Sequence, residues 1–178
     1  ALGSAVNRMV HKHVALQVPP ARYDIVAKHF MWAIHDVLGE AVTPAVHDAW
    51  LAALGQLAEI LIGAEASLYK EQKEQEGGWE GYRNFKIDNI DRTDSGIVRL
   101  TLKPEDGKAV AKAVAGQYIS LHFNPKDVEG MEGEAHLAPR HYSIVASDAN
   151  SLTLCVRKVG GGAISNHIHT KCQIGDTL

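Results

Sequence analysis

The sequence has little cysteine, no long apolar run and no recognisable leader. Its two cysteines, Cys155 and Cys172, are too few for a disulfide framework, and we interpret both as reduced, buried thiols. No run approaches the roughly 18 consecutive apolar residues that a membrane helix needs. The first residues, ALGSAVNRMVHKH, lack the basic region followed by an apolar core that marks a signal peptide. These absences exclude a disulfide-stabilised secreted protein and a membrane-spanning one, and they predict a cytoplasmic location.

The charge balance is also unremarkable. The 178 residues carry a formal charge of −3 with a sequence pI near 6.4, and 46% of them are hydrophobic. A near-neutral chain of this kind gives no reason to expect nucleic acid or a membrane surface as partner. The composition is that of an ordinary globular protein of one or two domains.

The first half of the chain is predicted to be helical. A helix within residues 1–17 is broken by Val18-Pro19-Pro20, because proline lacks an amide donor and restrains the residue before it. A second helix follows Pro20 and stops near Gly39. Thr43-Pro44 starts a third, in which apolar residues recur every three or four positions until a solvated charged run at 70–76.

The second half has the pattern of β-structure. Residues 83–158 alternate with period two and are interrupted by turn residues, with residues 124–139 forming a long loop. Short strands at this spacing predict a barrel or sandwich. We therefore expect two domains, residues 1–76 and 83–178, with a hinge at 77–82.

Both ends of the chain give the impression of a fragment. Three amphipathic helices bury little apolar surface by themselves, and the chain stops at Gly175-Asp176-Thr177-Leu178, where another strand is expected to start. The expectation is a piece of a longer protein that is inactive when isolated.

The first candidate for chemistry is His11-Lys12-His13. Residues two apart on a helix point to different faces, so His11 and His13 do not share one metal. Either alone is compatible with axial haem ligation or with an ordinary surface histidine, and the spacing by itself favours the latter.

A resemblance to the flavohaemoglobin family changes that balance. The stretch from His11 to Val26 resembles the family's sequence around its proximal histidine, where a Lys-His pair precedes by ten residues a tyrosine that opens the next helix. The residues around Trp50, the stretch Ile62–Tyr69 and Gly77-Gly78-Trp79-Glu80-Gly81 also resemble the family. The similarity extends over nearly the whole chain.

The resemblance implies a role for each residue of the helical half. His13 is implied to be the proximal ligand of haem iron, with Tyr23 and Glu65 forming a hydrogen-bonded relay behind it. A carboxylate that accepts the imidazole proton makes the ring a stronger electron donor. Lys12 matches a lysine that tunes redox potentials near the flavin. Without the resemblance, Glu65 is an unremarkable exposed helix residue and Tyr23 a half-buried core tyrosine.

The β half resembles the FAD domain of the ferredoxin-reductase family. Arginine pairs with phosphate, tyrosine packs on a flavin ring, and a glycine run before a helix offers free amides to a pyrophosphate. A flexible turn is the alternative for the glycines. The resemblance implies a six-stranded antiparallel barrel with one helix and an incomplete last strand. The residues that it assigns to FAD are Tyr118, Arg140, His141, Tyr142, Ser143, Gly161, Gly162 and Ser165.

The other histidines and the cysteines are interpreted as structural. No spacing of several metal ligands appears among them, and Cys155 sits in an alternating strand as a small core residue. The histidines in this group are His29, His35, His122, His136, His167 and His169.

The predicted fold class is therefore a partial all-α globin followed by an antiparallel β-barrel of ferredoxin-reductase type. The resemblance implies a nitric oxide dioxygenase that makes nitrate from NO and O2 with NAD(P)H electrons passed through FAD and haem b, as a monomer. Two alternatives stay open: an oxygen-binding or sensor globin joined to a reductase module, and a flavin reductase whose helical half only packs against it.

Overall fold

The structure is a computed structural model that describes residues 2–131 and 139–178; His136 lies outside the described residues. The chain divides into two compact units, Ala1–Glu71 and Gln72–Leu178, here called the helical unit and the β unit. The predicted class, a helical globin part followed by an antiparallel FAD-binding part, is confirmed.

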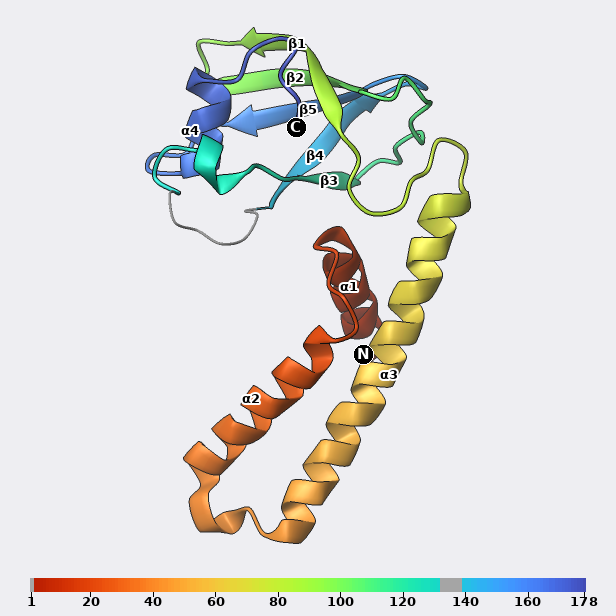
Figure 1. Cartoon of the computed structure of the whole chain (residues 1–178), viewed down its shortest axis with the longest axis vertical. Helices are drawn as coiled ribbons and strands as arrows, with labels where there is room; N and C mark the ends of the chain where they lie inside the picture. The colour runs from red at the N-terminus through yellow and green to blue at the C-terminus, as the bar shows by residue number, and fades with distance from the viewer. Residues whose placement is uncertain (1, 132–138) are drawn as a thin grey trace. The chain divides into compact units, whose positions relative to one another are not determined.

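The helical unit contains α1 (Leu2–Ala15), α2 (Arg22–Leu38), a short 3-10 turn η1 (Gly39–Ala41) and most of α3 (Pro44–Glu74). Gly39 ends α2 with a φ of 52°, a left-handed conformation that glycine adopts at little cost. The amide of Val46 donates to the Thr43 hydroxyl at 3.4 Å at the start of α3. Figure 1 shows α2 and α3 as a hairpin joined through η1.

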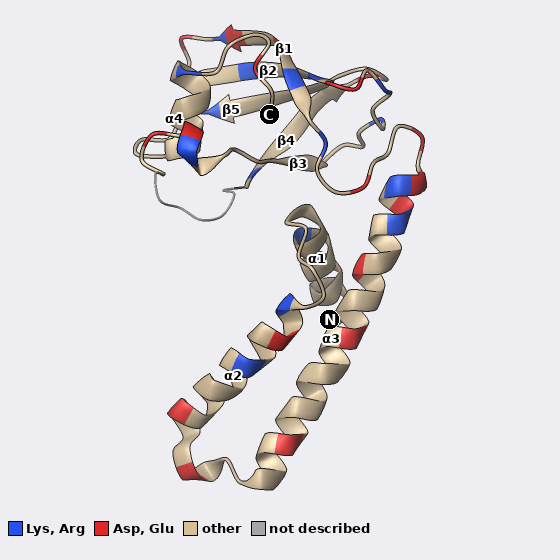
Figure 2. Ribbon diagram, viewed as in Figure 1, with Lys and Arg blue, Asp and Glu red and all other residues tan. Residues whose placement is uncertain are grey.

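The core of the helical unit lies between α1 and α3. Val10, Val14 and Leu61 are at most 4% exposed and pack together. Apolar side chains on α2 and α3 are less covered: Trp32 and Val37 of α2 are 67% and 78% exposed, and Leu51 of α3 is 43% exposed. Charged side chains of both signs gather instead at the C-terminal end of α3 (Figure 2).

The long third helix predicted from Thr43-Pro44 to the charged run at 70–76 is observed as α3. By length and apolar composition alone it qualifies as a candidate membrane-crossing helix, contrary to the prediction that no run is long and apolar enough. The prediction considers only uninterrupted runs of apolar residues. Within Pro44–Glu74, small and polar residues interrupt the apolar ones, but the mean hydropathy of the helix is still high. One such helix is weak support for a membrane span, because core helices of soluble proteins meet the same criteria.

The β unit is built on a five-stranded antiparallel sheet with the order β1-β2-β5-β4-β3. The strands are β1 (Phe85–Arg92), β2 (Ile97–Pro104), β3 (Tyr118–Leu121), β4 (Arg140–Ser147) and β5 (Leu152–Arg157). A 3-10 turn η2 (Pro125–Asp127) follows β3, and α4 (Ala163–Thr170) follows β5 (Figure 1). Residues 175–178 pair with β1 through a bridge between Lys86 and Thr177 and through backbone hydrogen bonds to Phe85 and Ile87, as an incomplete sixth strand would.

The core of the β unit follows from the alternation seen in the sequence. Val98, Leu100 and Leu102 of β2 lie opposite Val156, Leu154 and Leu152 of β5, and all six are at most 1% exposed. Residues on one face of a strand alternate with those on the other, so this face is the interior.

The interpretation of Cys155 as a buried core residue is wrong. Cys155 is exposed, because it occupies the outward position of β5 between the buried Leu154 and Val156. Cys172 is buried as predicted, and burial raises the pKa of its thiol to about 11, with Asp176 adding to the shift and Arg92 opposing it.

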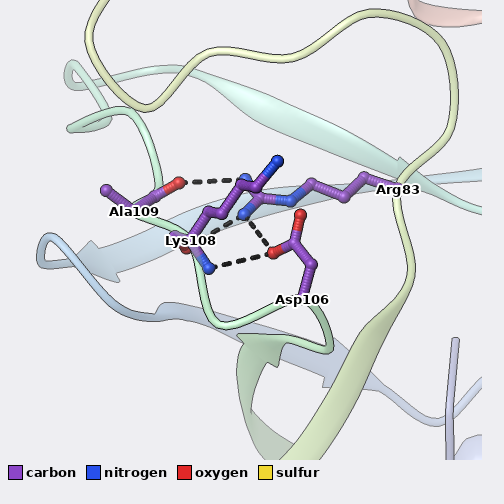
Figure 3. A network of polar contacts seen from close by, with 4 residues as sticks. All are labelled: Arg83, Asp106, Lys108 and Ala109. Carbon is purple, nitrogen blue, oxygen red and sulfur yellow. Dashed lines mark hydrogen bonds and ion pairs between the residues drawn. The ribbon is translucent and has the colours of Figure 1, made fainter.

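Hydrogen bonds hold the segment that precedes β1 against the rest of the β unit. The Ala111 amide donates to the Gly77 carbonyl at 2.8 Å. The Arg83 guanidinium contacts Asp106 at 2.6 Å and donates to the carbonyls of Lys108 and Ala109, both at 2.9 Å (Figure 3). These contacts hold the segment against the connection between β2 and β3.

Gly77 and Gly81 provide a matched test of this packing. Both have a positive φ, of 71° and 69°. A Cβ at Gly77 would collide with the backbone of Val110 and Ala111, whereas one at Gly81 would meet nothing within 4 Å. We expect Gly81→Ala to lower the free energy of unfolding by about 1–2 kcal/mol, the cost of the left-handed conformation.

Gly77→Ala adds an overpacking cost of about 1–3 kcal/mol to that conformational cost. Urea unfolding of the two variants, followed by far-ultraviolet circular dichroism, measures the difference. Equal losses of stability in the two variants would contradict the close approach at Gly77.

Candidate functional site

The first candidate site lies in the helical unit and draws one side chain from each helix. His13 is in the last turn of α1, Tyr23 is the second residue of α2, and Glu65 is on α3. Between α1 and α2 the chain turns at Gln17, whose φ is 54°, and the Val18 amide donates to the His13 carbonyl at 3.0 Å. This turn brings the start of α2 back to the end of α1.

The three side chains meet within hydrogen-bonding distance. Nδ1 of His13 lies 2.8 Å from Oε1 of Glu65 and 2.8 Å from the Tyr23 hydroxyl. The Tyr23 hydroxyl donates to the same carboxylate oxygen at 2.5 Å. The side chain of Glu65 is 3% exposed and that of His13 is 31% exposed. A carboxylate as buried as Glu65 requires such donors, because burial without them is costly.

The pattern of donors assigns the imidazole tautomer. An ionised carboxylate only accepts hydrogen bonds, so Nδ1 of His13 carries the proton that Glu65 accepts. In the neutral ring, the lone pair is then on Nε2. Within the described part of the chain, Nε2 has no protein partner.

Tyr23 is held in its protonated form. Burial is the main cause that raises the pKa of its phenol, and the hydrogen bond to Glu65 and the charge of that carboxylate add to it. Tyr23 therefore stays a donor to Glu65 at any physiological pH. The cluster is a half-buried imidazole with a free lone pair, backed by a carboxylate and a phenol, which is an arrangement suited to metal coordination with an oriented ligand.

Lys12 and His11 do not belong to this cluster. Both are exposed on α1, beside His13 in the sequence but on other sides of the helix. His11 is therefore separated from the cluster, as the spacing predicted.

The second candidate site lies in the β unit, on β3 and β4. Tyr118 is paired with Ser143, Ile119 with Tyr142, Ser120 with His141 and Leu121 with Arg140. Since paired residues share a face, Tyr118, His141 and Ser143 lie on one side of the sheet and Arg140 and Tyr142 on the other. The sequence did not indicate this division of the predicted FAD residues.

Contacts within each face agree with the pairing. The rings of Tyr118 and His141 are in edge contact at 4.9 Å, and Nδ1 of His141 lies 2.9 Å from the Ser120 hydroxyl. Tyr142 packs against the core on the opposite face, where burial raises the pKa of its phenol.

Arg140 keeps its charge available. It is exposed at the start of β4, and its guanidinium donates to the neighbouring Pro139 carbonyl at 2.9 Å. A planar guanidinium in this position can bind a phosphate with two parallel hydrogen bonds.

The third group of predicted FAD residues is Gly161, Gly162 and Ser165, at the junction of α4 with the loop that follows β5. Side chains of α4 close this loop by hydrogen bonds. The buried hydroxyl of Ser165 accepts from the Val159 amide and donates to the Gly162 carbonyl, each at 3.2 Å. Asn166, which the sequence analysis missed, donates to the carbonyls of Val159 and Gly162 at 3.0 and 2.7 Å. Ser165 thus shapes the loop from inside and does not point outward.

The loop leaves backbone donors for an anion. A Cβ at Gly162 would lie 2.9 Å from the Ser165 hydroxyl, so the closed form requires glycine there. The first amides of α4 have no acceptor within the helix, and helix N-termini of this kind suit phosphate groups. The loop therefore fits a pyrophosphate, although no single side chain completes the site.

Several of the remaining histidines have structural partners. Nε2 of His169 lies 2.9 Å from the Val156 carbonyl, and the ring of His167 is in edge contact with Phe123 at 5.6 Å. Nε2 of His35 lies 2.9 Å from Nδ1 of His47. No group of three or more potential metal ligands occurs among the residues that the structure describes.

Comparison with known proteins identifies both units. Residues 1–61 match the globin family, and residues 85–178 match the oxidoreductase FAD-binding domain family. A flavohemoprotein from Pseudomonas putida is 45% identical over 179 aligned residues, which are 99% of this chain and 44% of that protein. A flavohemoprotein from Deinococcus radiodurans is 38% identical over 100% of this chain and 43% of its own length.

A solved structure agrees with these sequence matches. The crystal structure of a flavohemoglobin from Malassezia yamatoensis with bound FAD and heme has a TM-score of 0.81 and 25% sequence identity, over 98% of this chain and 43% of that one. The chain thus spans less than half the length of the relatives that it matches. The expected cofactors, haem and FAD, are those of the two matched domain families, and the residues described above fit both. The chain therefore belongs to the flavohaemoprotein family of oxidoreductases, with a globin part followed by an FAD-binding domain.

Proposed function

We propose that this chain is part of a nitric oxide dioxygenase, in which NAD(P)H supplies electrons for the reaction of NO and O2 to nitrate. The observation that carries the proposal is the buried contact of Glu65 with Nδ1 of His13, supported by Tyr23. An oxygen-storage globin or a packing domain has no use for a carboxylate that increases electron donation from its histidine.

The residues of the helical unit are assigned to the haem site. His13 would hold the haem iron through Nε2, Glu65 accepts a hydrogen bond from Nδ1, and Tyr23 donates to Glu65. The exposed Lys12 places a positive charge next to His13 in the sequence, where it shifts redox potentials electrostatically.

The residues of the β unit are assigned to FAD. Arg140 and the amides of the loop at Gly161 and Gly162 bind its phosphates, and Ser165 holds that loop closed. Tyr118, His141 and Ser143 contact the rest of the cofactor from one face of β3 and β4, and Tyr142 contributes from the other face, which it shares with Arg140. When bound, FAD would supply hydride and single-electron transfer chemistry, and haem would supply the iron chemistry that O2 and NO require.

The overall stoichiometry is two NO and two O2 with one NAD(P)H, giving two nitrate ions, NAD(P)+ and one proton. We further propose that the protein acts in the cytoplasm as a monomer, with O2 and NO as its small-molecule partners. The domain limits, residues 1–76 and 83–178 with a hinge at 77–82, stay a prediction.

The test uses a protein of the length of the relatives that contains these 178 residues, loaded with haem and FAD. With NADH or NADPH, we expect NO and O2 to disappear in equal amounts and nitrate to appear in the same amount. Electrodes for NO and O2, combined with a nitrate assay, measure the three quantities.

Two results would count against the proposal. Consumption of NAD(P)H without any dependence on NO would favour a plain flavin reductase. Stable oxygen binding without nitrate formation would favour a storage or sensor globin.

A further inference from the structure

His122 lies directly after β3, on the same side of the sheet as Tyr118 and His141. Leu121 and Phe123, on either side of it, are 6% and 5% exposed and face the interior. Alternation along the extended chain therefore places His122 on the outer face, as it does Tyr118 and Ser120. The contact between the side chains of Ser120 and His141 agrees with this, because it places both residues on the same face of the β3–β4 pair.

Both ring nitrogens of His122 are buried and lack a partner. In the described part of the chain, His122 and Arg83 are the residues with buried side-chain nitrogen atoms that make no hydrogen bond. Buried polar atoms are almost always paired in folded proteins, and an unpaired one calls for an explanation. For Arg83 the explanation is simple, because the other two nitrogens of its guanidinium make three hydrogen bonds and only Nε lacks one. His122 has no such compensation.

Tyr82 covers the His122 ring. The ring centroids are 3.9 Å apart with an interplanar angle of 55°, and Tyr82 itself is 53% exposed. The next residue, Arg83, is anchored to Asp106, Lys108 and Ala109 (Figure 3). Tyr82 is therefore held in place by its neighbour and keeps water from one side of the imidazole.

His122 is electrically neutral in this setting. Burial, together with the charge of His141, lowers its pKa. A neutral imidazole presents one donor and one acceptor. This combination matches the edge of a flavin nucleotide, which carries both carbonyl oxygens and N–H groups.

We propose that His122 is a further FAD-binding residue, whose ring nitrogens form hydrogen bonds with the bound cofactor while Tyr82 holds the ring in position. The inference rests on the FAD site proposed above. Three residues assigned to that site, Tyr118, His141 and Ser143, share the face of His122. FAD on this face would supply the partners that the two nitrogens lack.

The test compares FAD affinity in two variants of the 178-residue chain. His122→Phe keeps a ring against Tyr82 and removes both nitrogens, and the control His29→Phe makes the same change at an exposed histidine of α2 outside the proposed FAD site. We expect His122→Phe to raise the Kd for FAD about 10-fold, the effect of losing about one net hydrogen bond. His29→Phe should bind FAD like the unmodified chain. Quenching of flavin fluorescence measures the Kd.

A second measurement does not depend on a substitution. The ¹⁵N resonances of the His122 ring, assigned by nuclear magnetic resonance, should shift when FAD is added to the unmodified chain. If FAD binds and neither the Kd of His122→Phe nor these resonances change, the inference is wrong although the proposed FAD site stands. If the unmodified chain, folded by circular dichroism, binds no FAD, both the inference and the proposed site are overturned.

Discussion

Glu65→Gln is expected to lower NO turnover about 10- to 100-fold, the usual cost of altering a residue that orients a metal-bound histidine. Glutamine still offers an oxygen to Nδ1 of His13, but it lacks the negative charge that makes the imidazole a strong electron donor. The reduction potential of the haem iron should rise for the same reason. Turnover with NAD(P)H and a spectroelectrochemical titration of the haem-loaded protein measure the two effects.

Two further variants separate this effect from general damage. Glu59→Gln removes an exposed carboxylate from the same helix and should change neither quantity. Tyr23→Phe removes one donor to Glu65 and leaves the contact of the carboxylate with His13, so its effect should be smaller. A Glu65→Gln protein with unchanged potential and turnover would show that the carboxylate only fills space between α1 and α3.

Arg140→Ala is expected to raise the Kd for FAD by about 10- to 100-fold. Hydrogen bonds to a charged group contribute about 1.5–3 kcal/mol, and each 1.4 kcal/mol corresponds to a factor of ten in affinity. Fluorescence titration of the 178-residue chain with FAD measures the effect. Arg140 is exposed and donates only to the neighbouring Pro139 carbonyl among the bonds described, so its removal should leave the fold intact.

The matched control is Arg99→Ala, since Arg99 is an exposed arginine on β2 that belongs to no predicted site. Its loss should leave the Kd unchanged. Arg140→Lys should recover part of the affinity, because lysine keeps the charge but not the planar pair of donors. If Arg140→Ala bound FAD with the same Kd as the unmodified chain, the assignment of Arg140 to the phosphate site would be wrong.

Local sequence patterns predicted much of the fold. Val98, Leu100 and Leu102 alternate in the sequence and are buried on one face of β2, as period two requires. Gly39 and Thr43 end one helix and begin the next, because their conformations and side chains suit those positions. The same reasoning failed for Cys155, since alternation does not by itself say which face of β5 is covered.

The candidate sites were less accessible to such reasoning. Glu65 lies 52 residues from His13 on a helix whose pattern gives no sign that this carboxylate is buried. His122 was interpreted as an ordinary histidine, because nothing in the sequence indicates that Tyr82 packs on it. The roles of Tyr23, Glu65 and the FAD residues came from a family resemblance and not from their spacing.

By itself, the sequence determined the helices of the first unit, the strands of the second and the residue types available for chemistry. These depend on interactions between residues close in the chain, whose period and end signals can be read directly. Only the tertiary structure decided that His13, Tyr23 and Glu65 meet at one point and that His122 is buried without a partner. Burial and long-range contact depend on how separate elements pack, and that packing sets the charge and tautomer on which the chemistry depends.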